Sequence, residues 1–264
     1  MKRLLLRIMP KNRHIYNFCR DYVDRCNGDN NGDIFTNGEY RLMRETFGAC
    51  STVFDVGAYK GEWTQLALDI NPDLAIHCFE PSSESFRALE QKGFPGNVRL
   101  NNKGLSSSRE DRLLYLFGPG EGINSLYLRK GLEAGWSLEP QKETEAVSLD
   151  TLDEYCRERS IAQIDFLKID VEGHELEVLK GARTMITNKR VAMIQFEYGG
   201  CNIDSRTLLA DIFDYFDTAE YRFFKLHPDR LHPVPRYDQR LENFHYQNWL
   251  AVRKDFALPP ALLA

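Results

Sequence analysis

The sequence lacks the cysteine arrangements that accompany metal sites and disulfide frameworks. Its six cysteines are scattered over 264 residues, and no two of them form a CxxC pair. Structural zinc sites and redox motifs normally show such pairs, and small secreted domains show dense cysteine frameworks. The pattern argues against both, and it is typical of reduced thiols in a cytoplasmic protein.

An excess of positive charge and long apolar runs are also missing. The formal net charge is -5 and the pI is about 5.8. Because binding to nucleic-acid phosphates normally needs a basic face, we expect no nucleic acid as partner. The apolar run Leu4–Leu6 ends at Arg7. It is far shorter than the roughly 20 residues of a transmembrane helix, so we predict no transmembrane segment.

The pattern of apolar residues divides the chain in two. Helical spacing over residues 14–27 and 37–48 predicts an N-terminal helical cap within residues 1–50. Residues 51–255 form the predicted main domain. Within it, residues 105–147 are predicted to be an irregular insertion. Because long insertions are often binding loops, this one is a candidate acceptor loop.

Strands and helices alternate through the main domain, and its central strands are apolar throughout. This order predicts an α/β fold of the Rossmann-like type, with a mostly parallel seven-stranded sheet, helices on both faces and an antiparallel end. The predicted strands are Thr52–Asp55, Ala75–Phe79, Val98–Asn101, Ile164–Ile169, Val191–Phe196, Arg222–Leu226 and Gln247–Val252. The predicted helices between them are Glu62–Ile70, Ser83–Gln91, Leu149–Glu158, Glu175–Ile186 and Leu208–Tyr215.

A glycine turn follows the first strand in the stretch VFDVGAYKGEW. Gly57 and Gly61 flank a turn that leads into a helix N-terminus, where unpaired N–H groups favour a ligand. The spacing is GxxxG and lacks the further glycine of the dinucleotide fingerprint GxGxxG. It therefore favours a nucleoside without bridging phosphates. Asp55, at the strand end, is placed to meet the ammonium group of an amino acid moiety.

The second strand ends in HCFEP, with Glu80 following 25 positions after Asp55. An acidic residue at this place can accept hydrogen bonds from both ribose hydroxyls. Pro81 then stops the strand. A strand-end glutamate is often only an exposed residue, but together with the glycine turn it predicts a nucleoside site.

Acidic residues also follow the next two strands. Asp170, Glu172 and His174 lie in FLKIDVEGHELEVLKGA, and Glu197 lies in IQFEYGG. These side chains can deprotonate a hydroxyl, with His174 as the first candidate for the base and Asp170 and Glu197 beside it. Asp170, Glu172 and Glu197 can instead hold a hard cation such as Mg²⁺. The sequence leaves both uses open.

These motifs as a set resemble the FkbM family of methyltransferases. The matching stretches are FDVGAYKGEWT, FEPSSESF, VSLDTLDEY, LKIDVEGHELEVLKGA and FEYGG. The resemblance implies a class I methyltransferase fold over residues 51–255, S-adenosylmethionine as cofactor, and transfer to a hydroxyl on a sugar, glycan or natural product. One departure is Tyr59, where the family usually has Asn. The residues expected at the cofactor are Asp55, Gly57, Ala58, Tyr59, Gly61, Glu80, Pro81, Asn102 and Asp170.

Three other functions stay open at this stage. An NAD-dependent oxidoreductase has a similar sheet, although GxGxxG is missing. A non-catalytic nucleoside-binding domain would keep the fold without the reaction. Methylation of an amino group on nucleic acid or protein is disfavoured by the acidic pI and the absence of a DPPY-type motif. The sequence does not decide whether the protein is a homo-oligomer.

Overall fold

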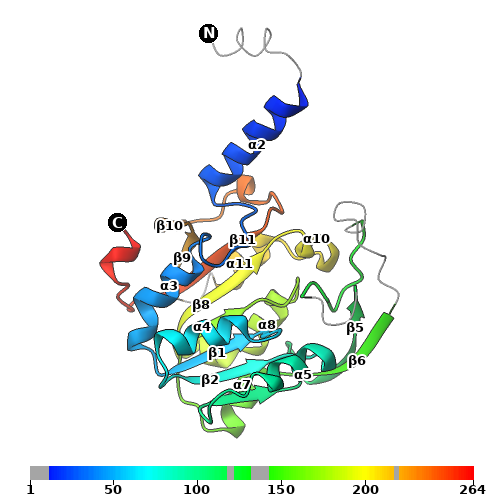
Figure 1. The fold of residues 1–264 in the computed structure, drawn as a ribbon. Helices are drawn as coiled ribbons and strands as arrows, with labels where there is room; N and C mark the ends of the chain where they lie inside the picture. Colours follow the sequence, from blue (N-terminus) through cyan, green and yellow to red (C-terminus); the bar gives the residue numbers. More distant parts are fainter. Residues whose placement is uncertain (1–11, 118–121, 132–142, 217–219) are drawn as a thin grey trace.

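Eight strands form the central sheet in a computed structural model of the chain (Figure 1). The structure describes residues 12–117, 122–131, 143–216 and 220–264. The strand order is β10-β9-β11-β8-β7-β1-β2-β3. The strands are β1 Thr52–Val56, β2 Ala75–Phe79, β3 Val98–Asn101, β7 Ile164–Ile169, β8 Val191–Tyr198, β9 Tyr221–Leu226, β10 Leu231–Pro233 and β11 Gln247–Arg253.

The five strands β3, β2, β1, β7 and β8 are parallel, and β11, β9 and β10 continue the sheet in antiparallel pairs. The predicted Rossmann-like α/β class is confirmed, but the predicted count of seven strands is wrong. The extra strand β10 has three residues and ends in Pro233, so it has no periodic signal in the sequence. It is the edge strand of the sheet and forms by backbone pairing with β9.

Helices cover both faces of the sheet, as predicted. Successive residues of β1 pack into different clusters, since Val53 contacts one hydrophobic core and Phe54 the other. The Val53 side is covered by α3 Glu39–Thr46, α4 Glu62–Ile70 and α5 Ser83–Gln91. The Phe54 side is covered by α7 Leu152–Glu158, α8 Glu175–Gly181, α9 Arg183–Thr187 and α11 Leu209–Tyr215.

The predicted helix Glu175–Ile186 is broken into α8 and α9 at Ala182. A Cβ atom on Gly181 would lie 1.9 Å from the backbone oxygen of Ser106. The chain of another segment thus passes directly over the helix at this point, which apolar spacing cannot reveal.

Much of the predicted irregular insertion, residues 105–147, is strand. A second sheet contains β4 Gly104–Leu105, β5 Glu110–Leu116 and β6 Glu143–Asp150, and β5 pairs with β6 antiparallel. The prediction failed because both long strands have one exposed, charged face, and only a few apolar residues such as Leu114 and Val147 are buried. Residues 118–121 and 132–142 of the candidate acceptor loop lie outside the described residues.

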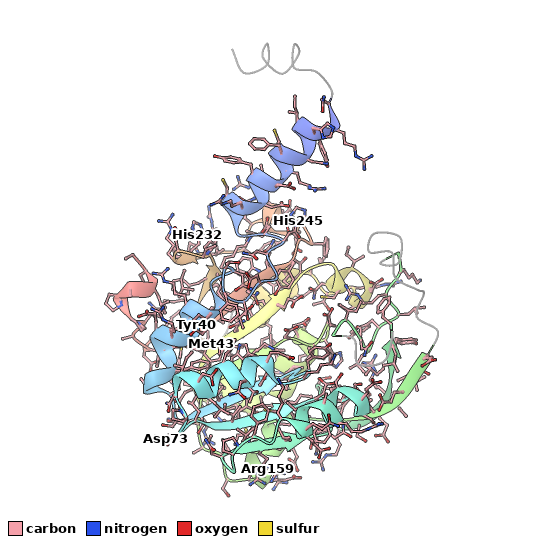
Figure 2. The ribbon with its side chains drawn as sticks, in the orientation of Figure 1. Tyr40, Met43, Asp73, Arg159, His232 and His245 are labelled. Atoms are coloured by element: carbon pink, nitrogen blue, oxygen red, sulfur yellow. The ribbon has the colours of Figure 1, made fainter. Side chains whose placement is uncertain are left out.

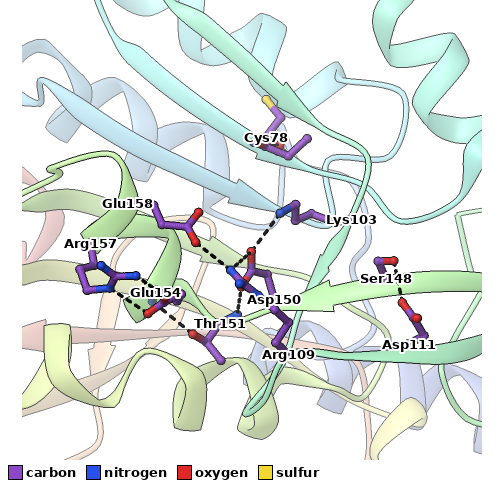
Figure 3. A network of polar contacts seen from close by, with 11 residues as sticks. Cys78, Lys103, Arg109, Asp111, Ser148, Asp150, Thr151, Glu154, Arg157 and Glu158 are labelled. Carbon is purple, nitrogen blue, oxygen red and sulfur yellow. Dashed lines mark hydrogen bonds and ion pairs between the residues drawn. The ribbon is translucent and has the colours of Figure 1, made fainter.

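A polar network anchors this second sheet to the main domain (Figure 3). At its centre is the buried carboxylate of Asp150, which accepts hydrogen bonds from Lys103 Nζ at 2.9 Å and Arg109 Nε at 3.1 Å. Asp150 also ends β6, so α7 begins only at Leu152, with Thr151 as its N-cap. The predicted helix start at Leu149 was therefore too early.

The predicted N-terminal cap covers residues 1–50, of which residues 1–11 lie outside the described part, and its two described helices differ in their packing. Helix α3 packs on the sheet through the buried Leu42 and Met43. Helix α2, Arg13–Asn27, has no buried residue and projects away from the body (Figures 1 and 2). Among the residues that the structure describes, no helix is long and apolar enough to cross a bilayer.

Candidate functional site

A cavity of about 660 Å³ opens at the carboxyl ends of β1, β2, β7 and β8. This is the edge at which ligands bind in open parallel sheets, and the volume lies within the usual range for small-molecule sites. Six of the predicted site residues reach it from these strand ends, and Pro81 makes a seventh. The six are Gly57, Tyr59, Glu80, Asp170, Glu172 and Glu197.

The turn after β1 brings two strand ends into close contact. Gly57 has a φ of 85°, and a Cβ atom there would lie 1.7 Å from the backbone oxygen of Asp170. Only glycine fits this position. Gly61, with a φ of 84°, faces Leu89 and Phe94 instead, so it serves packing beneath α4 and does not line the cavity. Ala58 is likewise buried outside the cavity.

Glu80 is held rigidly at the end of β2. Its carboxylate accepts hydrogen bonds from the backbone nitrogens of Tyr59 and Ser82, both at 2.9 Å. Burial raises the pKa of Glu80 to about 7. Asn102, which was expected at the cofactor, lies behind this turn, where its side chain donates to the backbone oxygens of Glu80 and Pro81. It shapes the turn without lining the cavity.

Tyr59 departs from the resembled family and also has an unusual backbone conformation. Its φ is 49°, in the left-handed region that Asn tolerates much better than an aromatic residue. The Asn usual in the family suits this conformation, so the substitution at Tyr59 costs backbone strain. The Tyr59 ring lines the cavity beside Gly122.

Asp55 does not face the cavity, and the predicted contact with an ammonium group of the ligand is wrong. Its side chain is fully buried, accepts a hydrogen bond from Thr64 Oγ1 at 2.7 Å, and lies 3.3 Å from Lys168 Nζ. The ammonium group that Asp55 meets is thus one of the protein's own. Lys168 Nζ also lies 3.3 Å from Asp170 Oδ2, so it connects the ends of β1 and β7.

Lys168, which was not among the residues expected at the site, supports the site from behind through its ion pairs with Asp55 and Asp170. It is 6% exposed, and although burial opposes its charge, Asp55, Asp170 and Glu39 together raise its pKa above the usual value. A signal was present, because a lysine inside the apolar run FLKI requires a buried anionic partner. Lysine at this place keeps a positive charge behind the cavity wall, 3.3 Å from the carboxylate of Asp170.

Three carboxylates meet at the cavity, as the sequence predicted. One oxygen from each of Asp170, Glu172 and Glu197 lies within 4.8 Å of the others. Burial and the neighbouring carboxylates raise the pKa of Glu197 well above its usual range, and burial raises that of Glu172 to about 8. Such a cluster is stabilised by a shared proton or a cation.

Arg129 supplies one of the cations at this cluster. Its Nη1 lies 2.6 Å from Glu172 Oε2, and its side chain is 8% exposed. Arg129 comes from the segment after β5, far from Glu172 in sequence, and no local pattern links the two residues. The predicted acceptor loop therefore contributes to the cavity through this arginine and through four residues before it, Gly122, Ile123, Asn124 and Leu126.

His174, the first candidate for the base, is placed outside the cavity. It is 1% exposed, and both ring nitrogens are engaged, Nδ1 with Tyr127 Oη at 2.8 Å and Nε2 with Ser106 Oγ at 3.0 Å. Burial lowers its pKa to about 4. Neither ring nitrogen faces the cavity, and through its two hydrogen bonds His174 joins α8 to the segments that follow β4 and β5.

The sheet order, the glycine turn after β1 and the acidic residue after β2 define the class: a Rossmann-like methyltransferase domain of class I. The family model described as the Methyltransferase FkbM domain matches residues 55–223, more than half of the chain. The chain therefore belongs to the FkbM methyltransferase family.

Two curated proteins and one solved structure are similar to this chain. The 31-O-demethyl-FK506 methyltransferase FkbM of Streptomyces tacrolimicus is 30% identical, over 56% of this chain and 66% of its own length. The 2-O-methyltransferase NoeI of Sinorhizobium fredii is 24% identical, over 54% and 62%. The chain thus spans less than two thirds of either relative. The crystal structure of methyltransferase FkbM from Methylobacillus flagellatus is 14% identical, with a TM-score of 0.48, over 76% of this chain and 43% of that one.

The first prediction concerns the buried pair Asp55–Lys168. Replacing Lys168 by Met leaves the carboxylate of Asp55 without its cation, so we expect the free energy of unfolding to fall by about 3–5 kcal/mol. The double variant Asp55→Asn, Lys168→Met should be more stable than Lys168→Met alone, because no charge is left unpaired. Urea unfolding followed by circular dichroism measures both, and strictly additive effects of the two substitutions would contradict the pairing.

Proposed function

We propose that this protein is an S-adenosylmethionine-dependent methyltransferase that methylates a hydroxyl oxygen on a sugar, glycan or natural product. The observation that carries the proposal is the cavity itself, in which the rigid carboxylate of Glu80 and the side-chain-free turn at Gly57 face a carboxylate cluster. Family membership supports it. So do the names of the two curated relatives, since each describes methylation at oxygen.

The residues of the cavity fit this cofactor. Gly57 lines the cavity, so a nucleoside can contact the main chain of the turn there. Glu80 has both carboxylate oxygens fixed by backbone N–H groups, and their remaining lone pairs can accept hydrogen bonds from the two ribose hydroxyls. S-adenosylmethionine supplies an electrophilic methyl group when bound. The FkbM family assignment disfavours the NAD-dependent alternative.

On the acceptor side, we propose Glu197 as the general base and Asp170 as the residue that orients the hydroxyl. Both line the cavity, unlike His174. Burial and the neighbouring carboxylates raise the pKa of Glu197 above its usual range, which makes its carboxylate a stronger proton acceptor. Holding the acceptor oxygen in line supplies most of the remaining acceleration. Phe244 and Tyr246 also line the cavity and can stack on a sugar ring.

Mg²⁺ binding is a second candidate role for the same cluster. Asp170, Glu172 and Glu197 present the oxygen ligands that this ion prefers, and their separation of less than 4.8 Å suits a shared cation. Arg129 and Lys168 already neutralise part of the charge, which weakens the demand for an ion.

A cytoplasmic location and the absence of a nucleic-acid partner stay predictions of the sequence, and homo-oligomerisation stays open.

The second prediction tests cofactor binding through Glu80. Ribose hydroxyls favour the charged carboxylate, and the pKa of Glu80 is about 7, so this form is populated only as the pH rises through that value. We therefore expect the affinity for S-adenosylhomocysteine to increase roughly tenfold from pH 6 to pH 8. Glu80→Gln should bind at least tenfold more weakly and lose this pH dependence. Titration calorimetry measures both effects, and an absence of binding in folded protein would reject the proposed function.

The third prediction separates the two candidate bases. Glu197→Gln removes a proton acceptor from the cavity, so turnover of a hydroxyl acceptor should fall about 10²–10⁴-fold while affinity for S-adenosylhomocysteine is kept. His174→Gln should lower thermal stability but leave turnover within a few-fold of wild type. Transfer of a labelled methyl group to a panel of glycan acceptors provides the assay. The opposite ranking of the two variants would restore His174 as the base.

The fourth prediction concerns the metal. If the cluster binds Mg²⁺, treatment with a chelator should abolish methyl transfer, and Mg²⁺ should restore it. Glu172→Gln should then raise the Mg²⁺ concentration needed for half-maximal activity, because one of the three oxygen ligands is weakened. If the chelator leaves turnover unchanged, the three carboxylates do not need Mg²⁺ and serve only to accept the proton and to position the acceptor.

A further inference from the structure

Helix α2 carries an apolar face that no described part of the chain covers. None of its residues is buried, and the helix stands apart from the body (Figures 1 and 2). Tyr16, Phe18 and Tyr22 are 66%, 71% and 63% exposed. Aromatic side chains of this size are rarely left in water together on a monomeric surface.

The apolar residues lie on one side of α2. Their spacing follows the helical repeat, and the charged and amide residues, including Arg13, Asn17, Arg20 and Asp24, occupy the opposite side. We call the apolar side the α2 face. It consists of Ile15, Tyr16, Phe18, Cys19, Tyr22, Val23 and Cys26.

Positive charge is concentrated at the same end of the chain. Residues 1–27 contain seven Lys and Arg and two Asp, a net charge of +5, although residues 1–11 lie outside the described part. Because the whole chain carries -5, residues 28–264 carry -10. An anionic surface would therefore attract the N-terminal end and repel the body, which orients the molecule with α2 toward that surface.

We infer that the α2 face docks on an anionic lipid surface. Tyr16, Phe18 and Tyr22 would lie at the level of the lipid headgroups, where amphipathic aromatic rings are favoured. Arg13 and Arg20 on the polar side would meet the lipid phosphates, and the charge of the chain before the helix adds to the attraction. Apolar burial and electrostatic attraction then act on the same helix, as they do in interfacial helices generally.

A second copy of this chain is a less suitable occupant. Fifteen residues span about 22 Å, which is two heptads, whereas coiled coils normally need three or four. The α2 face also presents tyrosine and cysteine where a helical dimer prefers branched aliphatic side chains.

Docking would bring the cavity close to the lipid. Only Gly28 and Asp29 separate α2 from Asn30, which lines the cavity. The joint is fixed, because the buried Asp29 is paired with Lys225 and Gly28 packs against His227. The orientation of α2 on a surface therefore sets the orientation of the cavity.

Vesicle flotation of the full chain tests the inference, using phosphatidylcholine vesicles with and without phosphatidylglycerol. We expect wild-type protein to float only with the anionic vesicles. Phe18→Glu, Tyr22→Glu should reduce binding about tenfold or more, because two aromatic side chains no longer enter the interface. The control His14→Glu, Asn17→Glu changes the charge equally on the polar side and should reduce binding clearly less. Since α2 has no buried residue, both double variants should keep the wild-type melting temperature.

Three results would overturn the inference. The first is a failure of the wild-type protein to bind anionic vesicles. Equal losses in the two double variants would show that charge alone drives binding. A concentration-dependent dimer in sedimentation, lost in Phe18→Glu, Tyr22→Glu and accompanied by no vesicle binding, would assign the α2 face to self-association. None of these results depends on methyltransferase activity.

Discussion

The buried ammonium group of Lys168 holds the carboxyl ends of β1 and β7 in the arrangement on which the cavity depends. It lies 3.3 Å from both Asp55 and Asp170, one fully buried and the other on the cavity wall. The two strands meet so closely here that Gly57 leaves no space for a Cβ atom beside Asp170. The backbone contact at Gly57 brings the carboxylates of Asp55 and Asp170 near each other. The ammonium group of Lys168 compensates the negative charge of both.

Other carboxylates of the cavity are also buried and are partly compensated by neighbouring groups. Glu80, Glu172 and Glu197 all have raised pKa values, because burial disfavours their charged forms. Hydrogen bonds from backbone N–H groups offset the cost of burying a charged carboxylate at Glu80, and the ion pair with Arg129 offsets it at Glu172. A site of this kind is poised to gain stability from a ligand that brings hydroxyl donors or a proton, which is the chemistry proposed for the cofactor and the acceptor.

Sequence patterns located the strand ends well and the side-chain directions less well. The acids Glu80, Asp170, Glu172 and Glu197 were placed at the cavity because parallel strands end at one edge. Asp55 and His174 are also titratable residues close to strand ends, yet both are buried behind the wall with partners from other segments. Burial depends on such distant partners, and so do the strands within residues 105–147, whose exposed faces conceal the pattern.

The sequence by itself determined the alternation of strands and helices, the glycine turn and the order of the acidic motifs, because these depend on local periodicity and backbone freedom. Only the tertiary structure decided which polar groups face the cavity, which are paired inside, and which apolar face stays uncovered on α2. Lys168 meets Asp55 across 113 positions and Arg129 meets Glu172 across 43. Contacts over such separations arise when the sheet assembles, and no local pattern encodes them.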